Sequence, residues 1–331
     1  MCNNGCFNTQ SDQRNCGRCG HDCFGGMCSG GTCQSWIVTQ PPTTSQVTGL
    51  ASDGNNVIWA DSGSTSVIQV TYLGTNKMTL ASNASFNTIA SAQNWPMALA
   101  GTTVAWGTSD HVWTATVGSP GSGKEYPYAF TGGSGLDNLA INPQATYVGA
   151  TLNDGAGNID LYDCAIGGST CTAAGSVPSV FALGATATSS TYFVVDAADG
   201  SIESHAFGSG AVGPFKVGLG TPTLLASDSN NLYWANANGP AINRMSLLGG
   251  AVSSVITQFD SSTEFLMSIA TDGTNVYVTT EATPSILVYA PVSGCCAPTT
   301  LASGTNPTVV VAARGKVFWV DGNTINGIAA P

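Results

Sequence analysis

Cysteine is the residue type in this sequence with the clearest potential for chemistry. Seven of the eleven cysteines lie between Cys2 and Cys33. Cysteines this close together either bind zinc or form disulfide bonds. Cys16 and Cys19 form one C-x-x-C pair, but the segment has no second clean pair of this kind, and its only imidazole is that of His21. We therefore favour disulfides over zinc, and disulfides indicate an oxidising, extracellular compartment.

The cysteine-rich segment needs such bonds because a chain of about 34 residues cannot build an adequate hydrophobic core. We expect six of its cysteines to form disulfides, with the connectivity left open: Cys6, Cys16, Cys19, Cys23, Cys28 and Cys33. An odd number of cysteines leaves one over, and we choose Cys2 as the unpaired member. Cys2 is then either a free thiol or a link to another chain.

The four later cysteines form two groups. Cys164 and Cys171 flank a short Gly-rich turn between two expected strands, so a hairpin would place them opposite each other and predicts a disulfide. Cys295 and Cys296 lie at the corresponding turn of a later repeat. They are candidates for a vicinal disulfide or for intermolecular thiols.

Histidines and acids offer little further chemistry. His111 and His205 lie outside any recognised catalytic motif, and we interpret His205 as an ordinary exposed strand residue. A weak candidate for a cation site is the group Asp154, Asn158 and Asp160, but its spacing lacks the EF-hand pattern and favours a hairpin turn. We predict no catalytic residue, no metal and no cofactor.

Three other aspartates recur in front of turns: Asp53, Asp228 and Asp272. We expect their side chains to accept hydrogen bonds from the turn backbone.

Four aromatic residues lie in or near the longest insertion and do not follow the repeat described below: Trp95, Trp113, Tyr126 and Tyr128. Exposed rings among Asn, Ser and Thr would suit stacking on sugar faces. The alternative, which we favour, is that they belong to a packed loop.

The composition excludes some classes of function. The 331 residues include 8 Lys and Arg and 19 Asp and Glu, which gives a net charge of −11. This balance argues against binding to nucleic acid or to an anionic membrane surface. No apolar run is long enough for a membrane helix. Abundant Gly, Thr, Ser, Val and Asn favour strands and tight turns.

A repeat organises the chain after the cysteine-rich segment. It consists of an apolar strand, a turn rich in Asp, Asn and Gly, an aromatic strand, and two further strands. Aligning the aromatic strands gives seven equivalent positions, 40 to 47 residues apart: Trp59, Trp106, Gly149, Val194, Trp234, Val278 and Trp319. This period is typical of a four-stranded propeller blade. We therefore predict an all-β, seven-bladed β-propeller with inter-blade tryptophans in its core.

The ends of the repeat region predict how the ring closes. The last repeat reaches Pro331 after three strands, whereas Ser35–Gln40 reads like the fourth strand at Ser253–Gln258. We expect this N-terminal strand to complete the last blade in a 3+1 arrangement, which removes an exposed sheet edge. The domains are thus a disulfide module at 1–34 and a propeller at 35–331.

Two resemblances support this division. The segment around Asn15-Cys16-Gly17, with Cys19-Gly20 and Cys23, resembles the stigma-specific type of cysteine-rich module, which also precedes repeat domains in secreted bacterial proteins. The phrase Leu232–Asn236, followed by Ile242–Arg244, is similar to YWTD-type and NHL-type propeller repeats, although the YWTD family has six blades. The resemblances imply a secreted propeller protein and do not specify a ligand.

Three classes of function stay open. The low charge, the cysteines and the scarcity of reactive groups favour a secreted or cell-surface structural or adhesive module. Its partners would be other protein chains, including copies of itself in a homo-oligomer or polymer. The alternative is a carbohydrate-binding lectin with glycan partners. A propeller-type lyase or lactonase is the third class, and it would need His or acidic residues converging on the central channel.

Overall fold

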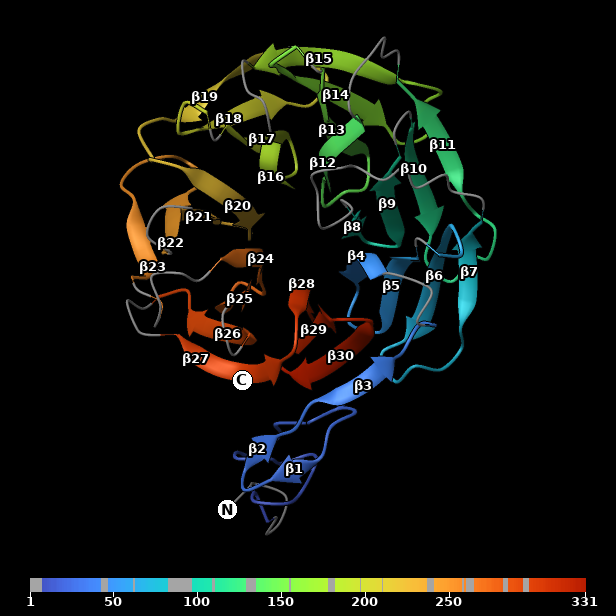
Figure 1. The fold of residues 1–331 in the computed structure, drawn as a ribbon, viewed down its shortest axis with the longest axis vertical. Coiled ribbons are helices and arrows are strands. Elements are labelled where there is room, and N and C mark those ends of the chain that lie inside the picture. The colour runs from blue at the N-terminus through green and yellow to red at the C-terminus, as the bar shows by residue number, and fades with distance from the viewer. Residues whose placement is uncertain are drawn as a thin grey trace.

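The fold is described from a computed structural model of the chain. It covers residues 8–42, 47–61, 63–82, 97–108, 111–128, 135–154, 156–177, 182–196, 198–209, 211–236, 241–257, 259, 265–281, 285–293 and 298–331. All regular secondary structure in these residues is β-strand. The same residues contain no helix that is long and apolar enough to cross a membrane. Figure 1 shows a ring of sheets with a small module attached at its rim.

Seven four-stranded antiparallel sheets form the ring, each running from an inner to an outer strand. The first four blades contain β4 (Val47–Ser52), β5 (Asn56–Asp61), β6 (Ser66–Thr71) and β7 (Met78–Ala81); β8 (Met97–Ala100), β9 (Thr103–Gly107), β10 (His111–Thr116) and β11 (Lys124–Pro127); β12 (Gly135–Ile141), β13 (Tyr147–Asn153), β14 (Ile159–Ala165) and β15 (Cys171–Val177); and β16 (Ala182–Ala187), β17 (Thr191–Asp196), β18 (Ser201–Ala206) and β19 (Val212–Lys216).

The remaining three blades follow the same order. They contain β20 (Pro222–Ser227), β21 (Asn231–Asn236), β22 (Ile242–Ser246) and β23 (Ser253–Ile256); β24 (Leu266–Thr271), β25 (Asn275–Thr280), β26 (Ser285–Pro291) and β27 (Thr299–Gly304); and β28 (Pro307–Ala313), β29 (Lys316–Asp321), β30 (Thr324–Ala329) and β3 (Trp36–Thr39). The seven-bladed propeller predicted from the repeat is confirmed.

The strand registers confirm the alignment of the repeats. Each of the seven aligned positions in the second strand pairs with the inner-strand residue nine positions earlier: Leu50↔Trp59, Met97↔Trp106, Ala140↔Gly149, Ala185↔Val194, Leu225↔Trp234, Ile269↔Val278 and Val310↔Trp319. The first hairpin is therefore the same length in every blade. Because the turn sets the register, each aligned side chain occupies an equivalent site.

A second backbone contact recurs in all seven blades. The N–H of the residue that follows the third strand donates to a carbonyl in the first turn, at 2.8–3.0 Å: Tyr72→Asn55, Val117→Thr102, Ile166→Thr146, Phe207→Ser190, Leu247→Asn230, Val292→Thr274 and Ala330→Gly315. In the first six blades these bonds place the first and third turns together on one face of the ring, and in the last blade the donor follows β30.

The predicted turn aspartates are also confirmed. The Oδ1 atoms of Asp53, Asp228 and Asp272 each accept two backbone N–H groups of the following turn, at 2.6–2.8 Å. In two blades a tyrosine hydroxyl donates to the other carboxylate oxygen, Tyr233 to Asp228 at 2.6 Å and Tyr277 to Asp272 at 2.7 Å. Burial is the main cause of the raised pKa of both tyrosines.

The core of the propeller lies between the blades. The tryptophans at the aligned site, Trp59, Trp106, Trp234 and Trp319, are at most 3% exposed, as predicted. At Gly149 a Cβ would lie 2.6 Å from the ring of Tyr192 in the next blade. A large side chain therefore fills the space that a small residue leaves, as close packing requires.

The ring closes through the N-terminal strand. β3 pairs antiparallel with β30, with Trp36 opposite Gly327 and Ile37 opposite Asn326. The last blade thus takes three strands from one end of the described chain and its outer strand from the other, as predicted. Figure 1 shows β3 beside β30, with the module extending from its start. Closure in this way leaves no blade with a missing outer strand.

Candidate functional site

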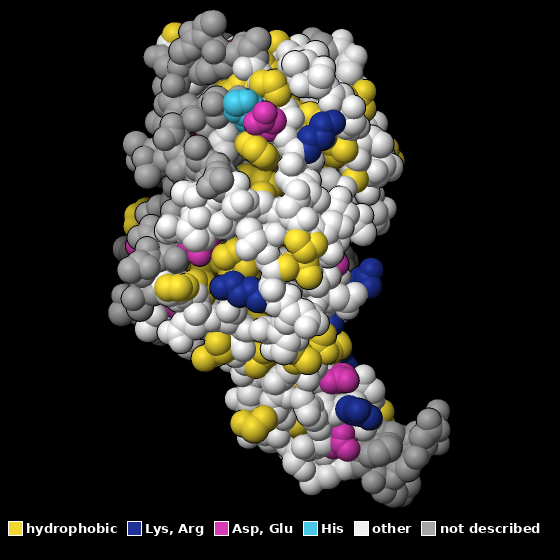
Figure 2. Space-filling model, turned by 90° about the vertical axis from the view of Figure 1, so that its right-hand side faces the viewer, with side chains coloured by type: hydrophobic (Ala, Val, Ile, Leu, Met, Phe, Trp, Pro, Cys, Tyr) yellow, Lys and Arg dark blue, Asp and Glu magenta, His cyan; other side chains and the backbone are white. Residues whose placement is uncertain are grey.

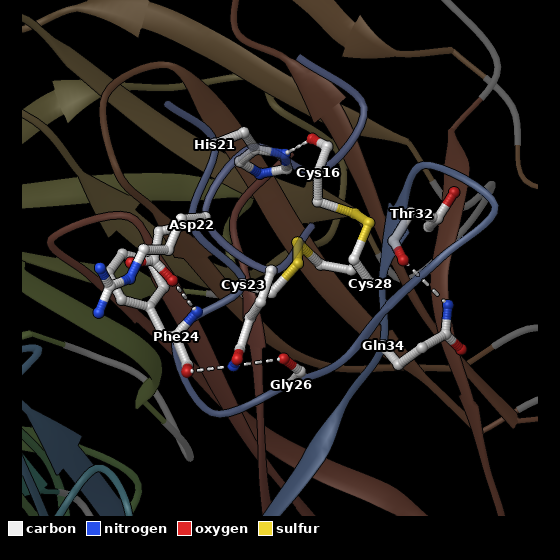
Figure 3. Close-up of a disulfide and its surroundings, with 12 residues drawn as sticks. Cys16, His21, Asp22, Cys23, Phe24, Gly26, Cys28, Thr32 and Gln34 are labelled. Atoms are coloured by element: carbon white, nitrogen blue, oxygen red, sulfur yellow. Dashed lines mark hydrogen bonds between the residues drawn. A yellow bond between two sulfur atoms is a disulfide. The ribbon is translucent and has the colours of Figure 1, made fainter. Parts of the chain in front are cut away.

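The cysteine-rich module is a small loop structure with one two-stranded hairpin, β1 (Cys28–Ser29) with β2 (Thr32–Cys33). Disulfides join Cys16 to Cys28 and Cys23 to Cys33, and Cys19 is also disulfide-bonded. Figure 3 shows the two bridges lying close together. The sulfurs of Cys16, Cys23 and Cys28 lie within 4.8 Å of one another because of this proximity.

The structure therefore supports disulfides rather than zinc in this segment. Cys2 and Cys6 lie outside the described residues, so the predictions for them stay predictions. The division of the chain into 1–34 and 35–331 also stays a prediction, but the contacts between the two parts are visible.

The module packs on the propeller at the point where the ring closes. Trp36, the first residue of β3, donates its indole N–H to the backbone oxygen of Tyr72 at 2.9 Å. Its ring meets Tyr72 and Phe318 edge to face, with centroids 6.4 and 6.3 Å apart. Two glycines make room for it, because a Cβ on Gly25 or on Gly327 would lie within 3 Å of the indole.

A buried lysine lies in the same contact. The Lys316 Nζ is 3.8 Å from the ring centroid of Phe24 in the module and 4.6 Å from that of Tyr72 in the first blade. Only 5% of Lys316 is exposed, and this burial is the main reason that its pKa is lowered. His21 adds a polar contact, with Nε2 3.1 Å from the backbone oxygen of Ala330 and Nδ1 2.9 Å from that of Cys16.

A cleft of about 370 Å³ runs between the module and the propeller. The module side is formed mainly by Arg18, His21 and Thr32, and the propeller side by Tyr289 of β26 and Thr299–Leu301 of β27. Gly17 and Gly31 also line the cleft on the module side. Pockets of this kind occur preferentially where two domains meet. The cleft was not foreseen from the sequence, because its two sides are far apart in the chain.

The central channel contains two further cavities of about 420 and 330 Å³. The residues shared by both are Met97, Ala98 and Leu99, and the other described lining residues are mostly Ala, Val, Leu, Ser and Thr from inner strands. None of these lining residues is His, Asp, Glu, Lys or Arg. The residues that line these two cavities therefore offer no group suited to general acid or base catalysis.

The predicted disulfide of the third blade is present. Cys164 pairs with Cys171 across β14 and β15, and the two sulfurs are bonded. Both residues belong to the buried core that this blade shares with the second blade, and they are 1% and 6% exposed. Cys295 and Cys296 lie outside the described residues.

Tyr126 and Tyr128 are packed, which is the interpretation favoured from the sequence, and their burial speaks against the glycan-stacking alternative for these two residues. Tyr126 is 1% exposed and Tyr128 6%, because both rings pack in the core between the second and third blades. The Tyr128 hydroxyl donates to the backbone oxygen of Thr108 at 2.7 Å. Trp113 is half-buried and stacks on Trp106, with ring centroids 6.1 Å apart. Trp95 lies outside the described residues.

The weak cation candidate is a hairpin turn, which was the interpretation favoured from the sequence. Asp154 Oδ1 accepts the N–H groups of Ala156 and Asn158, and Oδ2 accepts the Asn158 side chain at 2.6 Å. These bonds, above all that from the Asn158 side chain, lower the pKa of Asp154. Asp160 lies on β14 opposite Leu152 and Ser176, in strand pairing.

The interpretation of His205 as an exposed residue is wrong. His205 is 1% exposed, and its Nε2 lies 2.8 Å from Asp163 Oδ2 in the preceding blade. Its Nδ1 lies 2.9 Å from the backbone oxygen of Ala211. Asp163 Oδ2 also accepts the N–H of Gly208 at 2.6 Å. The pair joins two blades, and a carboxylate and a histidine 42 residues apart gave no local signal in the sequence.

Solved structures of other proteins share this architecture. Virginiamycin B lyase from Staphylococcus aureus is similar with a TM-score of 0.66 and 12% identity, over 90% of this chain and 99% of that chain. The U3-55K structure is similar with a TM-score of 0.65 and 12% identity, over 89% of this chain and 98% of that chain. The structure of the WD40 repeats of RRP9 is similar with a TM-score of 0.63 and 11% identity, over 90% of this chain and 97% of that chain. No protein-family model matches the sequence, and a search of the curated proteins found no match.

This chain is a seven-bladed propeller with a disulfide-linked N-terminal module. At identities of 11–12% the similarity shows the fold alone. Propellers support binding, scaffolding and catalysis, so the function must be argued from the surfaces of this molecule.

Proposed function

We propose that this protein is a secreted or cell-surface structural or adhesive propeller, which assembles with other protein chains and does not catalyse a reaction. The observation that carries the proposal is the attachment of the module to the ring. Trp36, Lys316 and His21 hold a disulfide-linked unit against the last and first blades. A fixed pair of units can present a defined composite surface to a partner.

The surface chemistry supports contacts with proteins rather than with charged polymers. Figure 2 shows a face on which charged side chains are few among polar and scattered apolar atoms, with one small group of acidic and basic side chains near its lower end. The chain as a whole has a net charge of −11. Interfaces between proteins are depleted in charge at their centres, so such a surface can be covered at a small desolvation cost.

The cysteine chemistry supports an extracellular location. Three disulfides are described, at Cys16–Cys28, Cys23–Cys33 and Cys164–Cys171. Disulfides persist in oxidising compartments, and the resemblance of the module to stigma-specific modules of secreted proteins agrees with this. The residues that line the two channel cavities include no His, Asp, Glu, Lys or Arg, which supports a role without catalysis.

Electrophoresis with and without reductant, together with light scattering, tests the proposal. The expected result is a series of covalent multimers that reductant converts to monomer and that Cys2→Ser abolishes. Cys295→Ser tests the other candidate thiols, and loss of the multimers in that variant instead would place the intermolecular bond there rather than at Cys2. A monomer under both conditions, with one titratable thiol, would contradict covalent assembly. Saturable binding on a glycan array by that monomer would favour the lectin alternative instead.

A further inference from the structure

The cleft between the module and the propeller has the features of a site for an extended peptide. Its propeller side includes the start of β27, the outer strand of the sixth blade, which pairs only with β26 among the described strands. The other edge of an outer strand presents unpaired N–H and C=O groups, which are a template for an added strand. The lining residues Thr299–Leu301 span about 10 Å at 3.3 Å per residue.

The module supplies the second side that the other outer strands lack. Gly17, Gly31 and Thr32 face β27 across the cleft of about 370 Å³. Gly17 and Gly31 have positive φ angles of 71° and 78°, and a Cβ on Gly17 would lie 2.5 Å from the Gly31 oxygen. Side chains other than glycine are therefore disfavoured at Gly17, where the chain passes close to Gly31.

The polar groups of the cleft are available for a ligand. Within the described residues, the hydroxyls of Thr299 and Thr300 form no hydrogen bond, and both residues are exposed. Arg18 is the one described lining side chain with a permanent positive charge, and it too is exposed without an ion pair in the described part of the chain. An exposed guanidinium without an ion pair favours a carboxylate over a cationic side chain, because it can bind both carboxylate oxygens at once.

We propose that this cleft binds an extended segment of a partner protein, which adds a strand to the free edge of β27 and places a carboxylate against Arg18. The proposal rests on the proposed function in protein assembly, since it names the kind of partner. The ring supplies backbone hydrogen bonds, which give affinity without sequence preference, and Arg18 supplies the selection for an acidic segment.

Fluorescence anisotropy with defined peptides tests the site. The probe is a fluorescein-labelled heptapeptide of alternating threonine and valine with one central aspartate. The comparison probes carry a central lysine, or N-methyl groups on alternate backbone nitrogens. The aspartate probe should bind saturably, the lysine probe should bind more weakly, and the N-methylated probe should not bind. Arg18→Glu should weaken binding of the aspartate probe roughly five- to tenfold. Arg14 is an exposed arginine of the same module outside the cleft, and Arg14→Glu should leave binding unchanged.

Hydrogen exchange locates the bound peptide. Binding should slow exchange of the amides in Thr299–Gly304 and leave those of the outer strands β15 and β19 unchanged. Absence of saturable binding at millimolar peptide, equal binding of the N-methylated probe, or protection confined to other strands would overturn the proposal. If the protein forms covalent multimers but does not bind the peptide, the proposal of peptide binding in the cleft fails and covalent assembly stands. If the protein binds the peptide but never forms multimers, covalent assembly fails and peptide binding stands.

Discussion

Gly327→Ala should destabilise the closure of the propeller, although it adds only one methyl group. Gly327 lies on β30 opposite Trp36 of β3. A Cβ at this position would be 2.6 Å from Cζ2 and 2.7 Å from Cε2 of the Trp36 ring. Carbon atoms in contact are normally about 3.5–4.0 Å apart, so the ring or the strand would have to move by about 1 Å.

The surroundings leave the Trp36 ring little room for this movement. Its N–H is bonded to the Tyr72 oxygen at 2.9 Å, Phe318 lies against its edge, and Gly25 also approaches the ring closely. Overpacking of a well-packed site costs about 1–3 kcal/mol, and a weakened hydrogen bond adds about 0.5–1.5 kcal/mol. Replacing glycine by alanine also stabilises the fold by about 0.4–1 kcal/mol, because it reduces the conformational entropy of the unfolded chain. We expect a net loss of about 2 kcal/mol in the free energy of unfolding.

Equilibrium unfolding in urea measures this change, and Gly213→Ala provides the matched control. Gly213 also lies in a strand, β19, its φ is not positive, and nothing lies within 4 Å of an added Cβ. The control should be unchanged or slightly more stable. In Gly327→Ala, hydrogen exchange should also accelerate first in β3 and β30. Equal urea midpoints for the two variants, or unchanged exchange at the closure, would refute this account of the packing around Trp36.

Three other outcomes follow from buried groups. Cys164→Ala with Cys171→Ala should lower the free energy of unfolding by about 2.5 kcal/mol, from the loop that the bond closes; an unchanged urea midpoint would contradict this. Tyr277→Phe should cost about 1–2 kcal/mol at neutral pH through the bond to Asp272. Because burial raises the pKa of Tyr277 above its usual 10.0, the wild type should lose stability as pH rises past 10, and the variant should lose less. Burial lowers the pKa of Lys316 from 10.5. Between this lowered pKa and pH 10.5, the unfolded chain therefore keeps the ammonium proton that the folded chain has released. Wild-type stability relative to Lys316→Met should therefore rise as pH approaches 10.5, and parallel pH profiles of the two proteins would contradict the burial of this charge.

The repeat pattern of the sequence determined the propeller. The position of Trp59 recurs in every blade because each first hairpin has the same length, and hairpin length sets register locally. The same local logic placed Asp53 at a turn and Cys164 opposite Cys171. The likeness of Ser35–Gln40 to an outer strand predicted closure, since only the last repeat lacked that strand.

Only the tertiary structure decided which side chains lie between the blades and beneath the module. His205 looked exposed in its own strand, but the preceding blade buries it against Asp163. Tyr126 looked available to a sugar, but the third blade covers its ring. Lys316 acquires its aromatic neighbours from segments far away in the chain. Alternation along a strand predicts to which face of the sheet a side chain points. Its burial and its charge state depend on the residues that pack against that face, and these residues are distant in the sequence.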